Sequence, residues 1–171
     1  MSDEEWDKLR HLAIRRDVLH LAHGELRTTE ILSATATSVL RLDPGLQAEA
    51  LACTRRWDRD GKVGFVVARS ELFLPLLDLA YFDLIVCEMP TRPLPGSLAD
   101  GPDVAGLEED LQLIAIGCRP DACVVVTDYR PTDRATACAA EAVDRWVIKT
   151  GRSLVQHGSL GVIHCARKSC R

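Results

Sequence analysis

The chain has 171 residues, a length that fits one folded domain and leaves too little sequence for two well-buried cores. Hydrophobic residues make up 47% and charged residues 27%, a globular composition that excludes disordered, collagen-like and simple coiled-coil proteins. The 21 Lys and Arg against 25 Asp and Glu give a net charge of −4, which argues against a surface that binds nucleic acid by bulk positive charge alone.

Membrane and export signals are missing from the sequence. No apolar run is long enough to cross a bilayer. The amino end, residues 1–5, is acidic where a signal peptide carries basic residues. We therefore expect a cytoplasmic protein with no membrane partner.

The seven cysteines lack the closely spaced pairs of a zinc ribbon. Cys118 with Cys123, and Cys165 with Cys170, each enclose four residues, and His164 stands beside the second pair. A metal site at these pairs is one interpretation, but such spacing arises easily without a metal. We predict reduced structural thiols and no metal ligands.

In the first half of the chain, short segments rich in β-branched residues alternate with segments whose apolar residues are spaced three and four apart. The former pattern is typical of buried strands and the latter of helices. We predict, in chain order, a helix from Asp3 to Ile14, a strand that begins at Asp17 and leads to a turn at Gly24, a helix over residues 27–35, a strand over 39–42, a helix over 46–57 and a strand over 63–68.

The second half continues this alternation and then changes. It predicts a strand over 82–87, a helix over 107–116, a strand over 123–127 and a helix over 135–143. Residues 146–149 and 160–165 then predict two strands that pair antiparallel as a closing hairpin.

Strands that alternate with helices of this length form βαβ units and a mostly parallel sheet. We therefore predict a seven-stranded, doubly wound α/β fold with a carboxy-terminal antiparallel hairpin. It forms a single domain over residues 1–171, in which a helix over 1–16 precedes the core over 17–171. Residues 90–102 form the long irregular stretch, and such loops at strand ends often carry sites.

In chain order, this pattern resembles the class I S-adenosylmethionine (SAM)-dependent methyltransferases, and the resemblance covers nearly the whole chain. In that family the first strand and a Gly-rich turn hold the methionine part of the cofactor, and an acid after the second strand binds the ribose. The corresponding positions here are residues 18–26 for the cofactor turn, Asp43 for the ribose acid, residues 68–70 for the corner near the adenine, residues 82–91 for the fourth strand with its catalytic corner, and residues 118–122 for the turn before the fifth strand.

The corner after the fourth strand points to one branch of that family. Enzymes that methylate the amino groups of adenine or cytosine carry Asp or Asn, two prolines and an aromatic residue there, which hold and stack the flipped base. This chain has Glu88, Met89, Pro90 and Thr91. The resemblance therefore gives the catalytic positions to these four residues, although the first proline and the aromatic ring are missing.

The cofactor turn departs further from the family pattern. His20 replaces the family's acid, Ala22 and Leu26 replace two glycines, and Gly24 remains where the backbone must approach the cofactor closely. Ser70 or the neighbouring Arg69 stands in place of the acid near the adenine amine. The resemblance implies His20, Ala22, Gly24, Asp43 and Ser70 as the cofactor-binding positions, with the binding of SAM weakened or lost.

We therefore expect a SAM-dependent methyltransferase-like protein of the DNA/RNA amino-methylating type, with weakened catalysis, that works beside an active partner subunit. Whether the chain itself is an enzyme stays open. One alternative is an active small methyltransferase that acts on a nucleic-acid base or a small molecule, and another is a non-enzymatic α/β scaffold. This interpretation allows three kinds of partner: nucleic acid, a methyltransferase subunit and a second copy of the chain. The basic residues that are candidates for contact with nucleic acid are Arg15, Arg16, Arg55, Arg56, Arg92, Arg130, Arg134 and residues 167–171.

Two residues have competing structural interpretations. Asp43 precedes Pro44, so it is equally placed to cap a helix that begins at Gly45. Tyr129 follows the fifth strand and either lines the mouth of a substrate site or covers the end of the sheet.

Overall fold

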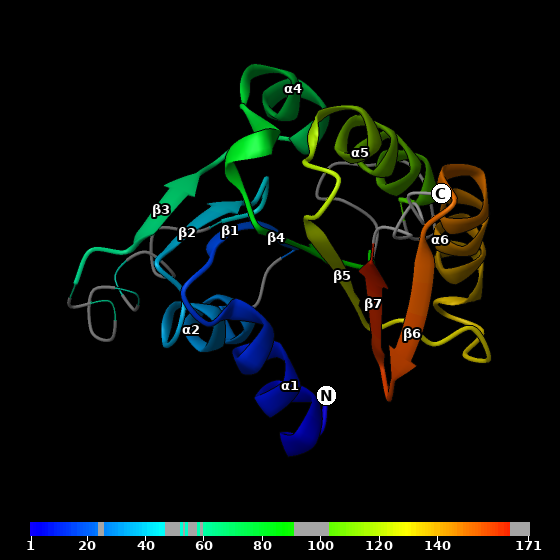
Figure 1. Cartoon of the computed structure of the whole chain (residues 1–171), viewed down its shortest axis with the longest axis horizontal. Coiled ribbons are helices and arrows are strands. Elements are labelled where there is room, and N and C mark those ends of the chain that lie inside the picture. Colours follow the sequence, from blue (N-terminus) through cyan, green and yellow to red (C-terminus); the bar gives the residue numbers. More distant parts are fainter. Residues whose placement is uncertain are drawn as a thin grey trace, which may run out of the picture.

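The computed structural model describes residues 1–23, 26–46, 52, 54, 58, 60–90 and 103–164. Within them, seven strands form one sheet (Figure 1). The strands are β1 (Asp17–Leu21), β2 (Ser38–Leu42), β3 (Val63–Val66), β4 (Leu84–Glu88), β5 (Cys123–Thr127), β6 (Ser153–His157) and β7 (Leu160–His164). The helices are α1 (Asp3–Ala13), α2 (Arg27–Ser33), α4 (Ser70–Phe73), α5 (Val104–Gly117) and α6 (Ala137–Thr150), with short 3₁₀ turns η1 (Leu74–Leu76) and η2 (Leu79–Tyr81).

The strand order is β3-β2-β1-β4-β5-β7-β6. Neighbouring strands from β3 to β5 pair in parallel, whereas β7 is antiparallel to both β5 and β6. This arrangement confirms the predicted doubly wound fold and its closing hairpin. The order also reverses between β1 and β4, and ligands bind open α/β sheets at the carboxyl ends of strands near such a reversal.

One predicted strand is wrong. Residues 146–149 belong to the last turn of α6, and the hairpin begins instead with β6. The helix continues because Trp146 and Val147 bury their side chains in the core while Ile148 remains exposed, a helical rather than an alternating pattern. Gly151, with φ of 64°, then ends the helix, and its N–H donates to the carbonyl of Ile148.

The predicted helix over 46–57 falls almost wholly outside the described residues. Of that stretch the structure describes Leu46, Ala52 and Thr54, and the last two are helical. The other predicted elements recur with shifts at their ends; α5, for example, begins at Val104 rather than at residue 107.

Helices cover both faces of the sheet (Figure 1), and a hydrophobic core lies on each side of it. On one face, α5 and α6 cover Leu19 and Leu21 of β1. On the other face, α1 and α2 cover Val18 and the β2 residue Val39. Because side chains alternate along a strand, His20 lies on the same face as Val18, beneath α2. Among the described residues, no helix combines the length and the apolar character needed to span a bilayer.

Candidate functional site

Two charged or polar side chains interrupt the apolar face beneath α2. His20 of β1 and Arg41 of β2 are paired in the parallel register, and both are 0% exposed. They lie next to the carboxyl ends of their strands, at the edge where the resemblance places the cofactor. Buried polar groups of this kind require hydrogen-bond partners within the protein.

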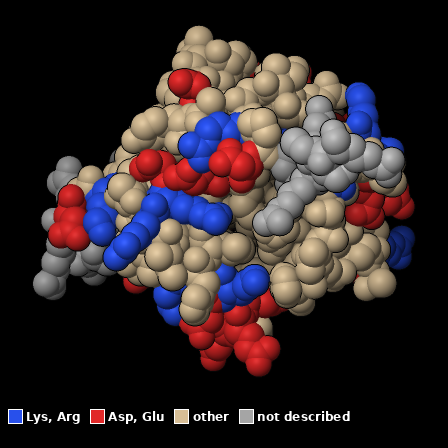
Figure 2. Space-filling view, viewed as in Figure 1, with Lys and Arg blue, Asp and Glu red and all other residues tan. Residues whose placement is uncertain are grey.

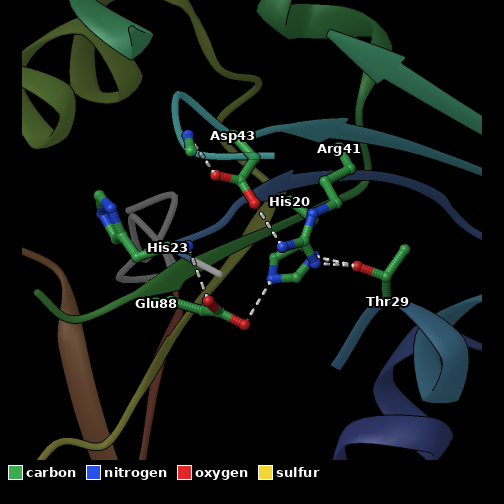
Figure 3. Close-up of polar contacts among 7 residues, drawn as sticks. His20, His23, Thr29, Arg41, Asp43 and Glu88 are labelled. Carbon is green, nitrogen blue, oxygen red and sulfur yellow. Dashed lines mark hydrogen bonds and ion pairs between the residues drawn. The ribbon is translucent and has the colours of Figure 1, made fainter. Parts of the chain in front are cut away.

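The partners form a continuous set of contacts across three strands and a helix, which we call the buried polar chain (Figure 3). Glu88 Oε1 lies 3.1 Å from His20 Nε2, and His20 Nδ1 lies 3.0 Å from Thr29 Oγ1. Arg41 Nη1 donates to the same Thr29 oxygen at 2.6 Å, and its Nη2 donates to Asp43 Oδ2 at 2.5 Å. The buried polar chain therefore joins β4, β1, α2 and the end of β2.

Both carboxylate oxygens of Glu88 have partners in this arrangement. Oε1 faces His20, and Oε2 accepts the backbone N–H of His23 at 2.8 Å, which fastens the turn after β1 to the end of β4. Burial raises the pKa of Glu88, but the charge of His20 and the hydrogen bonds from His20, His23 and Thr28 outweigh it and lower the pKa to about 2. Glu88 is thus an ionised, internally paired carboxylate.

Asp43 is similarly occupied. Its side chain is 1% exposed; Oδ2 pairs with Arg41, and Oδ1 accepts the N–H of Gly45 at 2.8 Å. The Gly45 contact is the local turn interaction that the sequence offered as the alternative to ribose binding. Each oxygen of Asp43 already accepts a bond from the protein.

Of the other positions that the resemblance implies, some are buried in the fold and some lie outside the described residues. The N–H of Ala22 donates to the carbonyl of Leu42 at 2.9 Å, so this buried residue extends the pairing of β1 and β2. Met89 is buried in the core that includes Leu21, and Pro90 is buried as well. Gly24 and Thr91 lie outside the described residues.

Ser70 lies apart from the buried polar chain, in a small recess at the carboxyl ends of β2 and β3. Besides Ser70, the recess is lined by Pro44, Arg69, Glu71 and the first turns of α5, with His23 at the β1 side. The Ser70 hydroxyl donates to Asp110 Oδ2 at 2.8 Å. The recess therefore contains one predicted site residue whose polar partner is another residue of the lining.

Asp110 is the residue of the recess that the sequence reasoning missed, as Thr29 and Arg41 are in the buried polar chain. It is 6% exposed and lies in α5 between Leu107 and Ile114, on the helix face that enters the core. Burial raises its pKa to about 7; Ser70 opposes this rise, and neighbouring carboxylates add to it. The sequence did contain a signal for this residue. Leu107, Leu111 and Ile114 lie at positions i, i+4 and i+7 of an apolar helix face, and Asp110 at i+3 shares that face, so its carboxyl group must be buried.

Tyr129 covers the end of the sheet. It is buried in the core beside α6, and its hydroxyl donates to Asp144 Oδ1 at 2.6 Å. Burial and Asp144 raise its pKa to about 12. This geometry favours the structural interpretation of Tyr129.

The described cysteines are Cys87, Cys118, Cys123 and Cys138, and all four are free thiols. Burial raises the pKa of Cys123, so its thiol stays protonated. Within the described ranges, no group of three or more His, Cys, Asp or Glu side chains is placed to hold a metal ion. The pair Cys165 and Cys170 lies outside those ranges.

No family model matches the chain, and no curated protein matches it in sequence. Solved structures, in contrast, match the chain in fold at low sequence identity. A proposed methyltransferase from Streptococcus mutans in complex with SAH has a TM-score of 0.67 at 15% identity, covering 96% of this chain and 97% of that one. The N-methyltransferase NodS from Bradyrhizobium japonicum WM9 has a TM-score of 0.65 at 15% identity, with 96% of each chain covered. An rRNA methylase from Streptococcus thermophilus has a TM-score of 0.60 at 14% identity, covering 96% and 95%. The chain therefore has a class I methyltransferase-like fold, as its sequence predicts.

Proposed function

We propose that this chain is a SAM-binding, methyltransferase-like protein of the nucleic-acid amino-methylating type, with weakened catalysis of its own, that acts beside an active partner subunit. One observation carries the proposal. The two acids that the resemblance gives to catalysis and ribose binding, Glu88 and Asp43, are both held inside the protein by its own groups. Acids are thus present at both positions, but their oxygens accept hydrogen bonds from the protein itself.

The weakened catalysis follows from the corner after β4. Methyl transfer requires the acceptor amine to be held in line with the methyl group, and polar atoms at this corner would have to hold it. Among the described residues of the corner, Glu88 alone has a polar side chain, because Met89 and Pro90 are apolar and buried. An amine bound there would have to displace either His20 or the His23 N–H from Glu88.

Retained cofactor binding is supported by the recess at Ser70. Asp110 lines it and keeps Oδ1 without a hydrogen-bond partner among the described residues, so the recess still offers a polar atom to a ligand. His20 and Asp43, in contrast, do not fit the family's use of these positions. SAM, when bound, would supply an electrophilic methyl group, and the recess would contact only part of it, without a free ribose acid at Asp43.

The nucleic-acid part of the proposal is supported by the Glu88–Met89–Pro90 corner and by the similar fold of an rRNA methylase. Bulk positive charge does not support this part of the proposal, because the net charge of the chain is −4. On the face shown in Figure 2, Lys and Arg side chains lie beside Asp and Glu. Contact with nucleic acid would then depend on the partner subunit as well. An active small methyltransferase is the second candidate, favoured by the same recess.

The test combines binding and turnover on the purified chain. We expect isothermal titration calorimetry to detect SAM and S-adenosylhomocysteine (SAH), and radiolabelled SAM to transfer no methyl group to RNA or DNA above background. Copurification from the source cells should recover a second methyltransferase-like chain. Glu88→Gln and the exposed control Glu30→Gln should leave this result unchanged.

Two results would contradict the proposal. Transfer by the chain alone that Glu88→Gln abolishes and Glu30→Gln preserves would make it an active enzyme and would give Glu88 a catalytic role. No binding of either SAM or SAH would remove the cofactor and would favour a non-enzymatic scaffold.

A further inference from the structure

The strand β6 forms one edge of the sheet. It is the last strand in the order β3-β2-β1-β4-β5-β7-β6, and among the described residues its one strand neighbour is β7 (Figure 1). Its residues are exposed except for Leu154, which is partly buried. An edge strand presents a row of unpaired N–H and C=O groups, to which a further strand can be added.

This edge carries none of the features with which proteins usually block such addition. Those features are charged side chains, prolines and bulges. The sequence of β6 is Ser-Leu-Val-Gln-His, without Pro, Lys, Arg, Asp or Glu. Its pairing with β7 is one-to-one from Ser153 to His157, so no bulge interrupts it. The edge is therefore regular and open to another strand along its whole length.

The turn after β6 determines which backbone groups point outward. Two residues, Gly158 and Ser159, join β6 to β7. A two-residue turn is closed by a pair of residues that exchange both backbone hydrogen bonds, and such pairs alternate along an antiparallel ladder. Residues 153, 155 and 157 therefore bond to β7, whereas the backbone groups of Leu154 and Gln156 point away from the sheet.

Val155 is the apolar residue at the centre of this edge. It lies opposite Val162 of β7, so the two side chains are on the same face of the sheet, where Val162 belongs to the core beneath α1. Val162 is 1% exposed and Val155 is 46% exposed, so this core ends at β7. An apolar side chain from a neighbouring strand would cover Val155 and extend the core.

A second copy of β6 fits this edge when it runs antiparallel and is centred on Val155. In that register each Val155 lies opposite the other, and Leu154 lies opposite Gln156 of the second copy. The residues whose backbone groups point outward then face each other, so each such pair would exchange both hydrogen bonds. This register pairs the full length of β6 with itself, and no Lys, Arg, Asp or Glu of β6 meets a like charge.

We propose that β6 pairs with β6 of a second copy of this chain, antiparallel and centred on Val155, so that the two sheets become one continuous sheet. The second copy is the partner because the edge is complementary to itself: its outward backbone groups meet their own counterparts, and the exposed valine meets its own. The edge belongs to β6, whereas the buried polar chain joins β1, β2, β4 and α2. This inference therefore does not depend on the proposed function.

Sedimentation equilibrium on the purified chain tests for the second copy. We expect a dimer whose fraction rises with protein concentration. Val155→Lys places two ammonium groups opposite each other and should raise the dissociation constant of the dimer roughly tenfold or more. The control Val155→Thr keeps the β-branched shape without a charge and should change the dissociation constant less. Circular dichroism and thermal unfolding check that both variants fold.

A disulfide cross-link tests the register. Opposite residues of a non-hydrogen-bonded antiparallel pair have Cα atoms about 4.5 Å apart, a distance that a disulfide spans. Val155→Cys should therefore form a covalent dimer when oxidised glutathione is added. Ser153→Cys lies opposite His157 of the second copy and should not link to itself, but it should link to a chain that carries His157→Cys.

The cross-linking uses a background without other accessible thiols. In it, Ser replaces the exposed Cys138 and the three cysteines outside the described residues, Cys53, Cys165 and Cys170.

Three results would overturn the proposal. A monomer at every concentration, without a cross-link of Val155→Cys, would leave this edge to a different protein chain. A dimer that Val155→Lys does not weaken would place the contact elsewhere on the molecule. A cross-link of Ser153→Cys to itself that exceeds that of Val155→Cys would contradict the register. Each of these results leaves the binding of SAM unaffected, so the proposed function is tested separately.

Discussion

At the scale of single residues, His20 and Glu88 are best understood together. His20 Nε2 and Glu88 Oε1 are 3.1 Å apart, so the family's acid at position 20 would place two carboxylates in contact within a buried region. Like charges at that distance disfavour ionisation of both groups. The replacement of the acid by histidine and the retention of Glu88 are therefore physically compatible parts of one internal contact.

The lowered pKa of Glu88 makes a prediction about stability. Because the pKa is about 2 in the folded chain and 4.5 ordinarily, the ionised carboxylate stabilises the fold above pH 4.5, and this stabilisation is lost as the pH falls towards 2. Glu88→Gln should therefore lower the free energy of unfolding at pH 7 by up to about 3 kcal/mol. Urea unfolding at pH 7 and pH 3 measures this, and less than half of the difference should remain at pH 3.

The control for this prediction is Glu30→Gln, which changes an exposed acid of α2 and should show no such pH dependence. An equal difference between wild type and Glu88→Gln at both pH values would mean that the contact acts through shape rather than charge.

At the scale of secondary-structure elements, the end of α6 decides where the closing hairpin begins. Residues 146–149 are apolar enough to form a strand. Their burial instead follows a helical pattern, because the adjacent Trp146 and Val147 are both buried while Ile148 is exposed. The left-handed conformation of Gly151 then turns the chain, and the N–H of Arg152 donates to the carbonyl of Val147 at 3.1 Å. The helix end, rather than local strand propensity, sets the register of β6.

Gly151 should accordingly be sensitive to a side chain for backbone reasons alone. A Cβ at this position would meet nothing within 4 Å, so the cost of Gly151→Ala comes from its φ of 64°. We expect a loss of about 1 kcal/mol in the free energy of unfolding, and a smaller loss for Gly151→Asn, which tolerates this conformation better. Denaturant unfolding followed by circular dichroism compares the three chains, and an Ala variant as stable as wild type would contradict the assignment.

At the scale of the whole molecule, α1 connects distant parts of the chain. Leu9 and Ala13 of α1 belong to the core beneath the sheet, together with Val18 of β1 and Leu160 of β7. The Glu5 side chain accepts the backbone N–H of Ser159 in the turn between β6 and β7. The first helix thus contacts both the first strand and the closing hairpin (Figure 1).

The consequence is a global role for a residue near the amino end. Leu9 is 0% exposed, and Leu9→Ala should lower the free energy of unfolding by about 2–5 kcal/mol because it leaves a cavity in that core. The matched control, Leu72→Ala, removes the same atoms from a side chain that is 68% exposed and should change stability by less than about 0.5 kcal/mol. Similar losses for both variants would contradict a core role for α1.

The order of the elements follows from the sequence alone, because each element is encoded locally. The apolar run of β5 and the bounding residues before it predict that strand without reference to any partner, and the structure places it at Cys123–Thr127. The alternation of such runs with amphipathic helices then implies a parallel sheet, since parallel strands need a crossover. The fold class is therefore readable before any tertiary contact is known.

The roles of the acids were decided by the tertiary structure. Glu88 and His20 are 68 residues apart in the sequence, and Ser70 and Asp110 are 40 residues apart. No local pattern therefore reveals that both oxygens of Glu88 have partners, whereas Oδ1 of Asp110 has none among the described residues. A strand's amphipathic pattern depends on its own side chains, whereas the partner of a polar atom depends on which distant segments the sheet brings together. For this reason the sequence determined the scaffold, and only the folded chain decided which carboxylate oxygens are paired within the protein.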